Sequence, residues 1–127
     1  MLKLGITGTQ SVTVSEHNSA KTMGSGTLDV FATPAMIALM EKTAWTSISS
    51  YLEDGQGTVG TKLDVSHNAP TPLGMTVTCE SKLVEIDGRR LVFELTASDG
   101  KDVIGSGRHE RFLIWDEKFQ QKANSKL

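Results

Sequence analysis

The stretch Phe31–Leu52, FATPAMIALMEKTAWTSISSYL, decides the fold because it holds the clearest helix signal in the chain. Thr33 and Pro34 have the pattern of a helix N-cap followed by a proline at the first helical position, where a missing N–H costs nothing. The residues from Ala35 to Met40 are apolar on all sides, as in a helix that is buried around most of its circumference. We therefore predict a helix over residues 33–52 at the centre of the core.

Glu41 interrupts this apolar helix and is the first candidate for a functional side chain. Its neighbours one helical turn away are all apolar, namely Ile37, Ala38, Ala44 and Trp45. Because burial of an unpaired carboxylate is costly, a glutamate in this place needs a function or a charged partner. The alternative to a catalytic role is a structural carboxylate at the edge of the core, paired with Lys42 or with an arginine from the sheet.

The rest of the chain has the pattern of antiparallel strands. Val, Ile and Thr recur in alternating runs, and the pairs Asp87-Gly88 and Asp99-Gly100 are typical of tight turns. One helix followed by a meander of strands predicts a single α+β domain in which the sheet wraps the helix. The expected parts are a first strand in residues 1–15, a lid-like loop without regular structure at 16–32, the central helix at 33–52, antiparallel strands over 58–115 and a polar tail at 116–127.

The composition argues against several classes of function. Thirteen basic and fifteen acidic residues give a net charge of −2 without a basic run, so nucleic acid and anionic membranes are poor partners. No signal-peptide pattern or apolar run of membrane-spanning length occurs. The single cysteine, Cys79, excludes an internal disulfide and is expected in the core, and no Cys/His spacing indicates a metal site. We expect a cytoplasmic protein whose partner is a small molecule or another protein.

His67 is the second candidate for a functional side chain. The strand expected over residues 58–68 places alternate side chains on one mainly apolar face, which should contact the helix: Val59, Thr61, Leu63, Val65 and His67. His67 then lies at the end of the strand on the face toward Glu41. It is either a hydrogen-bonded packing residue or a catalyst.

Several blocks of sequence occur in one order between Val30 and Phe119: VFATPAMIALMEKTA, LEDGQGTVGTKLDVSHNAPTPLGMTVT and DGRRLVFELTASDGKDVIGSGRHERFLI, with EKF after it. Together they resemble the hot-dog thioesterases related to the fluoroacetyl-CoA thioesterase. The resemblance implies a hot-dog fold and a homodimer with acyl-thioester sites at the subunit interface. It also implies functions for five residues: catalysis by Thr33, Glu41 and His67, an oxyanion-binding backbone amide at Gly60, and a site arginine at Arg111.

These residue types suit hydrolysis of a coenzyme A thioester, with no cofactor or metal. The thiol leaving group has a pKa near ~8.5 by analogy with cysteine, so it needs little help from a general acid. Glu41 can activate water as a general base or attack the thioester directly, and the sequence leaves both routes open. His67 can orient water, move the proton or stabilise charge, and Gly60 lets a ligand approach the backbone closely.

Other roles for these residues stay open. Thr33 lies eight residues before Glu41, which is about 12 Å of helical rise, so the two side chains cannot share a hydrogen bond. The alternative role of Thr33 is that of the helix N-cap. Arg111 can bind a phosphate of coenzyme A or pair with a buried carboxylate, and His109 is interpreted as structural or interface-forming. The rival functions are a hot-dog protein that binds acyl thioesters without hydrolysing them, and a hot-dog dehydratase, whose acidic residue and histidine in one helical motif are missing.

The lid-like loop bears on substrate choice. In the enzyme that the chain resembles, selectivity for fluoroacetyl-CoA is associated with phenylalanines just ahead of the VFAT block, which form a lid over the acyl pocket. The corresponding stretch here, KTMGSGTLD, has Met23 and Leu28 as its only sizeable apolar residues and no aromatic one. Gly24 and Gly26 raise the entropy cost of holding it closed. We therefore predict a thioesterase for a small acyl-CoA without sharp fluoroacetyl selectivity.

Overall fold

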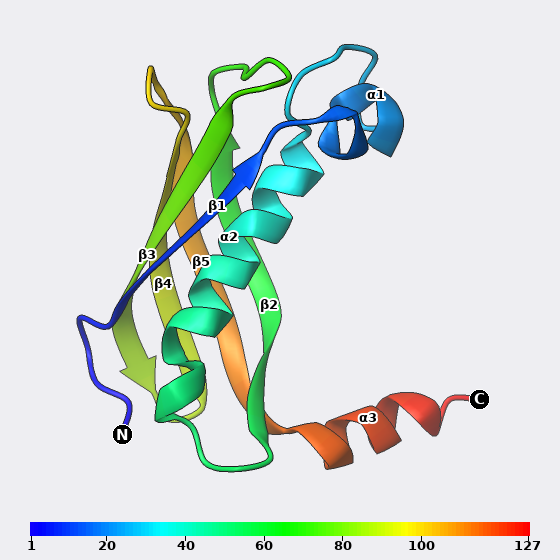
Figure 1. The fold of residues 1–127 in the computed structure, drawn as a ribbon. Helices are drawn as coiled ribbons and strands as arrows, with labels where there is room; N and C mark the ends of the chain where they lie inside the picture. Colours follow the sequence, from blue (N-terminus) through cyan, green and yellow to red (C-terminus); the bar gives the residue numbers. More distant parts are fainter.

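The computed structural model describes all 127 residues and places one long helix, α2, against a five-stranded antiparallel sheet (Figure 1). The strand order is β1-β3-β4-β5-β2, so β1 and β2 are the edge strands. The α+β architecture predicted from the sequence is confirmed. In chain order the elements are β1 (Thr7–Thr13), the 3₁₀ helix η1 (Glu16–Asn18), α1 (Ala20–Met23), α2 (Thr33–Ile48), the 3₁₀ helix η2 (Ser49–Tyr51), β2 (Gln56–His67), β3 (Thr76–Asp87), β4 (Arg90–Ser98), β5 (Val103–Trp115) and α3 (Asp116–Asn124).

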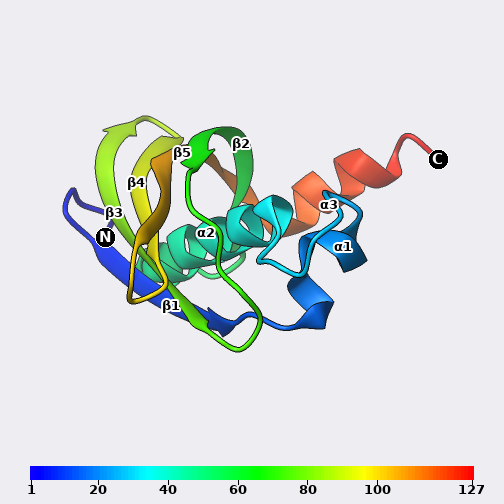
Figure 2. The same ribbon diagram turned by 90° about the horizontal axis from the view of Figure 1, so that it is seen from above.

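The core fills the space between α2 and the face of the sheet that curves around it (Figure 2). Met36, Met40 and Ile48 of the helix and Phe93 of β4 have no exposed surface. Burial of each such side chain stabilises the fold by about 1.5–3 kcal/mol relative to exposure. Cys79 is also fully buried in this cluster, which confirms that it is a core residue.

Helix α2 begins differently from the prediction. Its N-cap is Ala32, which makes no side-chain capping bond, and Thr33 is the first helical residue. The predicted N-cap role of Thr33 is therefore wrong, and its hydroxyl is available for another partner. Pro34 still lies in the first turn, where its missing N–H has no helical acceptor to lose. The α-helix ends at Ile48 and continues as η2 to Tyr51.

In the single chain, α2 is buried along one face only. The buried side chains recur every three or four residues, which is the spacing of a one-sided helix: Met36, Leu39, Met40, Thr43, Ala44 and Ile48. Ala38 and Trp45 lie outside this stripe, and Trp45 is 45% exposed. The expectation that the helix is buried around most of its circumference is therefore wrong for one chain.

Strand β2 contains a bulge that changes which side chains face the helix. Its pairing register with β5 shifts between Gly60 and Lys62, so Thr61 is an extra residue on the edge strand. As a result Gly60 and His67 both face α2, although residues seven apart on a regular strand lie on opposite faces. Val59 and Thr61 instead line a groove on the other face, so the predicted row of helix-facing residues is correct only from Leu63 to His67.

Residues 16–32 have regular structure where a loop was predicted. Ser15 caps η1 by accepting a hydrogen bond from the His17 N–H at 3.2 Å, and Ser19 caps α1 by accepting one from the Thr22 N–H at 3.2 Å. Helix α1 ends at Gly24, whose φ of +77° is the left-handed conformation common at helix ends. The unstructured part is therefore short and follows α1.

Both predicted turns and the polar tail are present. Gly88 and Arg89 form the two-residue connection between β3 and β4, and Gly88 takes the positive φ of +61° that this hairpin needs. Asp99 and Gly100 begin the turn into β5. The tail forms helix α3, which extends away from the sheet in Figure 1. None of the helices is long and apolar enough to cross a membrane.

Candidate active site

The end of β2 and the start of α2 bring Thr33 and His67 together. Thr33 Oγ1 and His67 Nδ1 are 2.8 Å apart. The second ring nitrogen of His67, Nε2, is buried and has no hydrogen-bond partner. Burial lowers the pKa of His67, more than the nearby Ala69 backbone raises it. The imidazole is therefore neutral at neutral pH and can accept or transfer a proton.

A small pocket of ≈ 240 Å³ opens beside this pair. One wall comes from α1 and the residues just before α2, including Ala20, Val30 and Phe31. The other wall is formed by the residues that follow β2, including Ala69 and Pro70. Its volume lies below that of typical drug-sized ligand sites, so the pocket suits a small group such as a short acyl chain.

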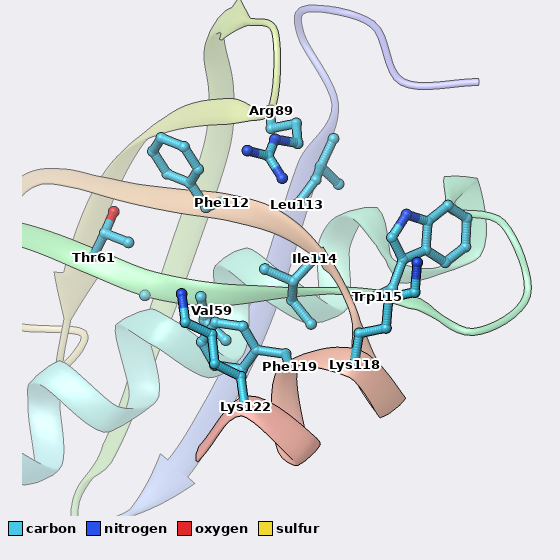
Figure 3. Close-up of a pocket in the computed structure, with 11 residues that line it drawn as sticks. Val59, Thr61, Arg89, Phe112, Leu113, Ile114, Trp115, Lys118, Phe119 and Lys122 are labelled. Atoms are coloured by element: carbon cyan, nitrogen blue, oxygen red, sulfur yellow. The ribbon is translucent and has the colours of Figure 1, made fainter. Parts of the chain in front are cut away.

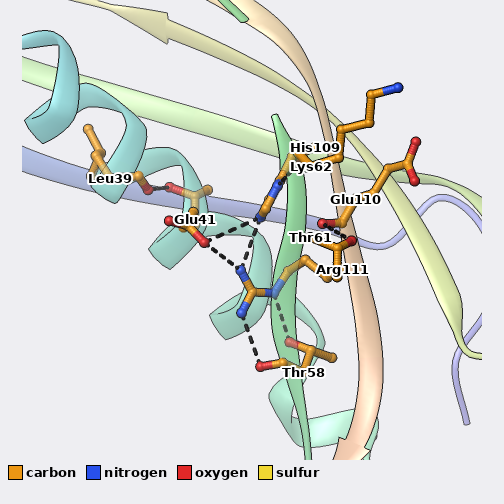
Figure 4. A network of polar contacts seen from close by, with 9 residues as sticks. Leu39, Glu41, Thr58, Thr61, Lys62, His109, Glu110 and Arg111 are labelled. Carbon is orange, nitrogen blue, oxygen red and sulfur yellow. Dashed lines mark hydrogen bonds and ion pairs between the residues drawn. The ribbon is translucent and has the colours of Figure 1, made fainter. Parts of the chain in front are cut away.

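Glu41 lies in a second polar cluster, about two turns further along α2 (Figure 4). Arg111 Nη1 donates a hydrogen bond to Glu41 Oε2 at 3.2 Å, and His109 Nε2 lies 3.9 Å from the same oxygen. The Arg111 side chain is 7% exposed and that of Glu41 is 37% exposed. Glu41 is thus an ion-paired carboxylate at the edge of the core. The sequence had left open that Glu41 pairs with an arginine and that Arg111 pairs with a carboxylate, and the structure pairs these two with each other.

Thr58 of β2 holds Arg111 through two hydrogen bonds. Its Nε donates to Thr58 Oγ1 at 2.8 Å, and its Nη2 donates to the Thr58 carbonyl oxygen at 3.1 Å. Burial lowers the pKa of Arg111 and the Glu41 carboxylate opposes that effect, so the guanidinium stays charged. With these contacts the Arg111 guanidinium is directed at Glu41, His109 and Thr58, and the whole residue is only 6% exposed.

Gly60 is a glycine because the Glu41 cluster leaves no room for a side chain. A Cβ at this position would overlap Glu41 Oε2 and come within 3.1 Å of His109 Cε1. Gly60 pairs with Arg111 across the β2–β5 ladder, immediately before the bulge. The backbone of β2 therefore approaches the Glu41 carboxylate more closely than any other residue type would permit.

The five residues predicted from the sequence fall into two groups within one chain. Thr33 and His67 form the first group, and Glu41, Gly60 and Arg111 form the second. Eight residues of α2 separate Thr33 from Glu41, about 12 Å of rise, so a contiguous triad is not present in the single chain. No group of three or more His, Cys, Asp or Glu side chains is arranged to hold a metal ion.

Two members of the second group were not predicted from the sequence, Thr58 and His109. His109 has no exposed surface and contacts Arg111 directly. The signal that could have found it is the spacing of two residues between His109 and Arg111, which places both on one face of β5. Thr58 gave no such signal, because its contact with Arg111 depends on which strand lies beside β5.

A groove of ≈ 690 Å³ lies on the opposite face of the sheet from α2, between the β2–β5 pair and α3 (Figure 3). Of the predicted site residues only Gly60 borders it. Phe112, Ile114 and Phe119 give it an apolar floor, with Lys118 and Lys122 at its edge. Neither Thr33 nor His67 lines it, and its lining contains no histidine or carboxylate.

Comparison with known proteins identifies the family and the fold. Residues 14–117 match the family of fluoroacetyl-CoA-specific thioesterases. The fluoroacetyl-CoA thioesterase of Streptantibioticus cattleyicolor is 47% identical over 98 residues, which are 77% of this chain and 70% of that protein. A solved structure of the fluoroacetyl-CoA thioesterase FlK is 38% identical, with a TM-score of 0.94 over 100% of this chain and 98% of that one. A hot-dog-like protein from Thermanaerovibrio acidaminovorans, 21% identical, shares the fold, with a TM-score of 0.88 over 98% of this chain and 92% of its own. The expected hot-dog fold is confirmed.

Proposed function

This chain belongs to the family of fluoroacetyl-CoA-specific thioesterases, and we propose that it hydrolyses a small acyl-CoA to a free acid and coenzyme A. Coenzyme A enters as part of the substrate, and the reaction uses no separate cofactor or metal. The observation that carries this proposal is the 2.8 Å contact between the Thr33 hydroxyl and the His67 imidazole beside a pocket of ≈ 240 Å³. A hydroxyl and a neutral imidazole at a pocket of this size are suited to acyl transfer.

The two polar clusters supply different parts of the reaction. A thioester hydrolase needs a nucleophile at the carbonyl carbon and a donor for the developing oxyanion. Glu41 provides the base for water or attacks directly, because Arg111 engages Oε2 while no hydrogen bond within the chain engages Oε1. Gly60 N–H is the oxyanion donor. Thr33 and His67 contact the thioester and move the proton, and Arg111 acts through Glu41 instead of binding a phosphate.

A second copy of the chain brings the two clusters together. Strand β2 is an edge strand with one row of unpaired backbone groups, which is a template for pairing with another strand. Antiparallel pairing of two β2 edges places the His67 end of one strand beside the Gln56–Gly60 end of the other. It also gives the exposed side of α2, including Trp45, a surface to pack against. We therefore propose a homodimer with a site at each end of the interface.

The compartment and the other partners follow from composition. The one thiol, Cys79, is buried and unpaired, which fits a reducing environment, so we propose that the enzyme acts in the cytoplasm. A net charge of −2 without a basic patch supports a small-molecule substrate and no role for nucleic acid or membrane binding.

Release of free thiol from a panel of acyl-CoA substrates tests the proposal. We expect turnover of small acyl-CoA substrates by the wild-type protein and its loss in the Glu41→Gln variant. Binding of acyl-CoA without thiol release would identify a non-catalytic acyl-thioester-binding protein, which is the main alternative. If no acyl-CoA binds or reacts, the proposed function is wrong.

A further inference from the structure

His109 is a buried histidine that the proposed reaction does not use directly. It has no exposed surface and lies on β5 between Leu63 of β2 and Phe93 of β4. Its ring centroid is 6.4 Å from that of Phe93, within the apolar layer under α2. A buried imidazole needs partners for both nitrogens. His109 has both, and the identity of these partners determines its state.

The hydrogen bonds fix the protonation state of His109. Nδ1 lies 2.8 Å from the Lys62 carbonyl oxygen, which can only accept, so Nδ1 carries the proton. Nε2 lies 3.0 Å from Arg111 Nη1, which can only donate, so Nε2 is the acceptor. Burial lowers the pKa of His109, and this effect exceeds the opposing one of the hydrogen bond to the Lys62 backbone. The Arg111 cation lowers the pKa further, and Glu41 and Glu110 raise it by less. His109 is thus a neutral imidazole with one defined tautomer.

In this tautomer His109 Nε2 accepts a hydrogen bond from Arg111 Nη1, the same nitrogen that donates to Glu41. Nη1 carries two hydrogens, of which one points to Glu41 Oε2 and the other to His109 Nε2. The Nε and Nη2 groups are bound by Thr58 on the other side. The guanidinium plane is therefore fixed at each of its nitrogens. Without an acceptor at position 109, one hydrogen of Nη1 would be buried without a partner and the plane would be free to tilt.

We propose that His109 is a positioning residue for the Glu41 carboxylate. By accepting from Arg111 Nη1 it holds the guanidinium in the plane that binds Oε2, and this leaves Oε1 directed at water or the thioester. Its other partner, the Lys62 carbonyl, follows the bulge at Thr61 directly. The same imidazole thus ties the carboxylate to the part of β2 that contains Gly60. This inference rests on the proposed function, because it assumes that Glu41 acts in hydrolysis.

Two substitutions separate the two hydrogen bonds of His109. The amide of His109→Asn can replace Nδ1 toward the Lys62 carbonyl but is too short to accept from Arg111. The amide oxygen of His109→Gln reaches the position of Nε2 and can accept from Arg111. We expect His109→Asn to lower kcat about ten- to hundredfold with little change in KM, because a misplaced catalytic group loses this much. His109→Gln should keep kcat within about threefold of the wild-type value.

A double-mutant cycle with Arg111→Lys shows whether the effect passes through Arg111. In that background, which has no planar fork to orient, His109→Asn should cause no further loss of kcat. Thermal unfolding of each variant reports the purely structural cost. The inference is wrong if His109→Asn keeps the wild-type kcat, or if the Asn and Gln variants lose kcat equally and in proportion to their loss of Tm. An inactive wild-type protein would instead refute the proposed function, and this inference with it.

Discussion

At the scale of single residues, the ion pair between Glu41 and Arg111 determines what a substitution of Glu41 should do. Glu41→Gln removes the proposed catalytic carboxylate and should lower turnover about 10²- to 10⁴-fold. It should also lower the free energy of unfolding by about 1 kcal/mol, because it weakens a pair whose carboxylate side chain is 37% exposed. A lone buried carboxylate would predict no loss of stability, since its removal relieves a desolvation cost. Thiol release and urea unfolding measure the two effects.

A matched control is available on α3. Glu117 is exposed in the first turn of that helix, so Glu117→Gln makes the same chemical change away from both polar clusters. It should leave both turnover and unfolding within error of the wild type. If Glu41→Gln behaves like this control, Glu41 has no part in the reaction.

The two inward-facing histidines make stability depend on pH. Burial puts the pKa values of His67 and His109 below the ordinary value of 6.5. Below that pH the unfolded chain binds more protons than the folded one. The free energy of unfolding should therefore fall as the pH is lowered, until the folded histidines also become protonated. We expect Tm to drop between about pH 7 and pH 5, and to drop less in His109→Gln.

The acidic residues change the stability in a lower pH range than the histidines do. The backbone N–H groups of Asp102 and Lys101 and the Thr71 hydroxyl lower the pKa of Asp99, and Arg90 lowers that of Glu110. Stability from these carboxylates is present above their ordinary values and is lost at more acid pH. A Tm that stays flat from about pH 7 to pH 5 would therefore contradict the histidine prediction alone.

At the scale of elements, local patterns predicted what local interactions determine. The proline-marked helix and the Asp-Gly turns follow from neighbouring residues, and the structure contains them. The bulge at Thr61 depends on how β2 pairs with β5, which is non-local, so strict alternation put Val59 and Thr61 on the wrong face. Thr33 followed by Pro34 has a capping pattern, but the cap is one residue earlier.

The candidate site follows the same division. Glu41 and His67 stood out because each is a polar residue in an apolar row, and this signal is local. Their distribution over two clusters was not predictable, because it depends on the strand order that puts β2 beside β5. His109 was missed as a partner of Glu41 for this reason, although its spacing from Arg111 placed both on one face.

Helix α1 and the residues after it should give the enzyme only weak discrimination between small acyl groups. Met23 and Leu28 are 46% and 65% exposed, so they do not pack as a lid in the single chain. One changed atom on an acyl group is worth only about 1–3 kcal/mol in an apolar pocket. We expect the ratio of kcat/KM for fluoroacetyl-CoA to that for acetyl-CoA to stay within about 200-fold. Propionyl-CoA and an aromatic acyl-CoA complete the comparison, and a preference of several orders of magnitude for fluoroacetyl-CoA would show that an aromatic lid is not required.

At the scale of the whole molecule, the exposed β2 edge and the uncovered side of α2 predict a dimer in solution. One chain has a mass of 13.7 kDa. Sedimentation equilibrium at micromolar concentration should give twice this mass. Because Thr33 and Glu41 lie too far apart to act together in one chain, thiol release should fall as the protein is diluted into monomers. A stable monomer with full activity would show that one chain holds a complete site.

The bulge in β2 is linked to the number of residues between Gly60 and His67, and this number can be compared in related chains. Two residues can face the same side of a regular strand only when their separation is even, and a bulge is needed when it is odd. Gly60 and His67 have an odd separation and both face α2. A relative with an even number of steps between the corresponding glycine and histidine can therefore keep the site with a regular edge strand. The length of this segment, more than the identity of its residues, reports whether the bulge is present, and it can be counted in any related sequence.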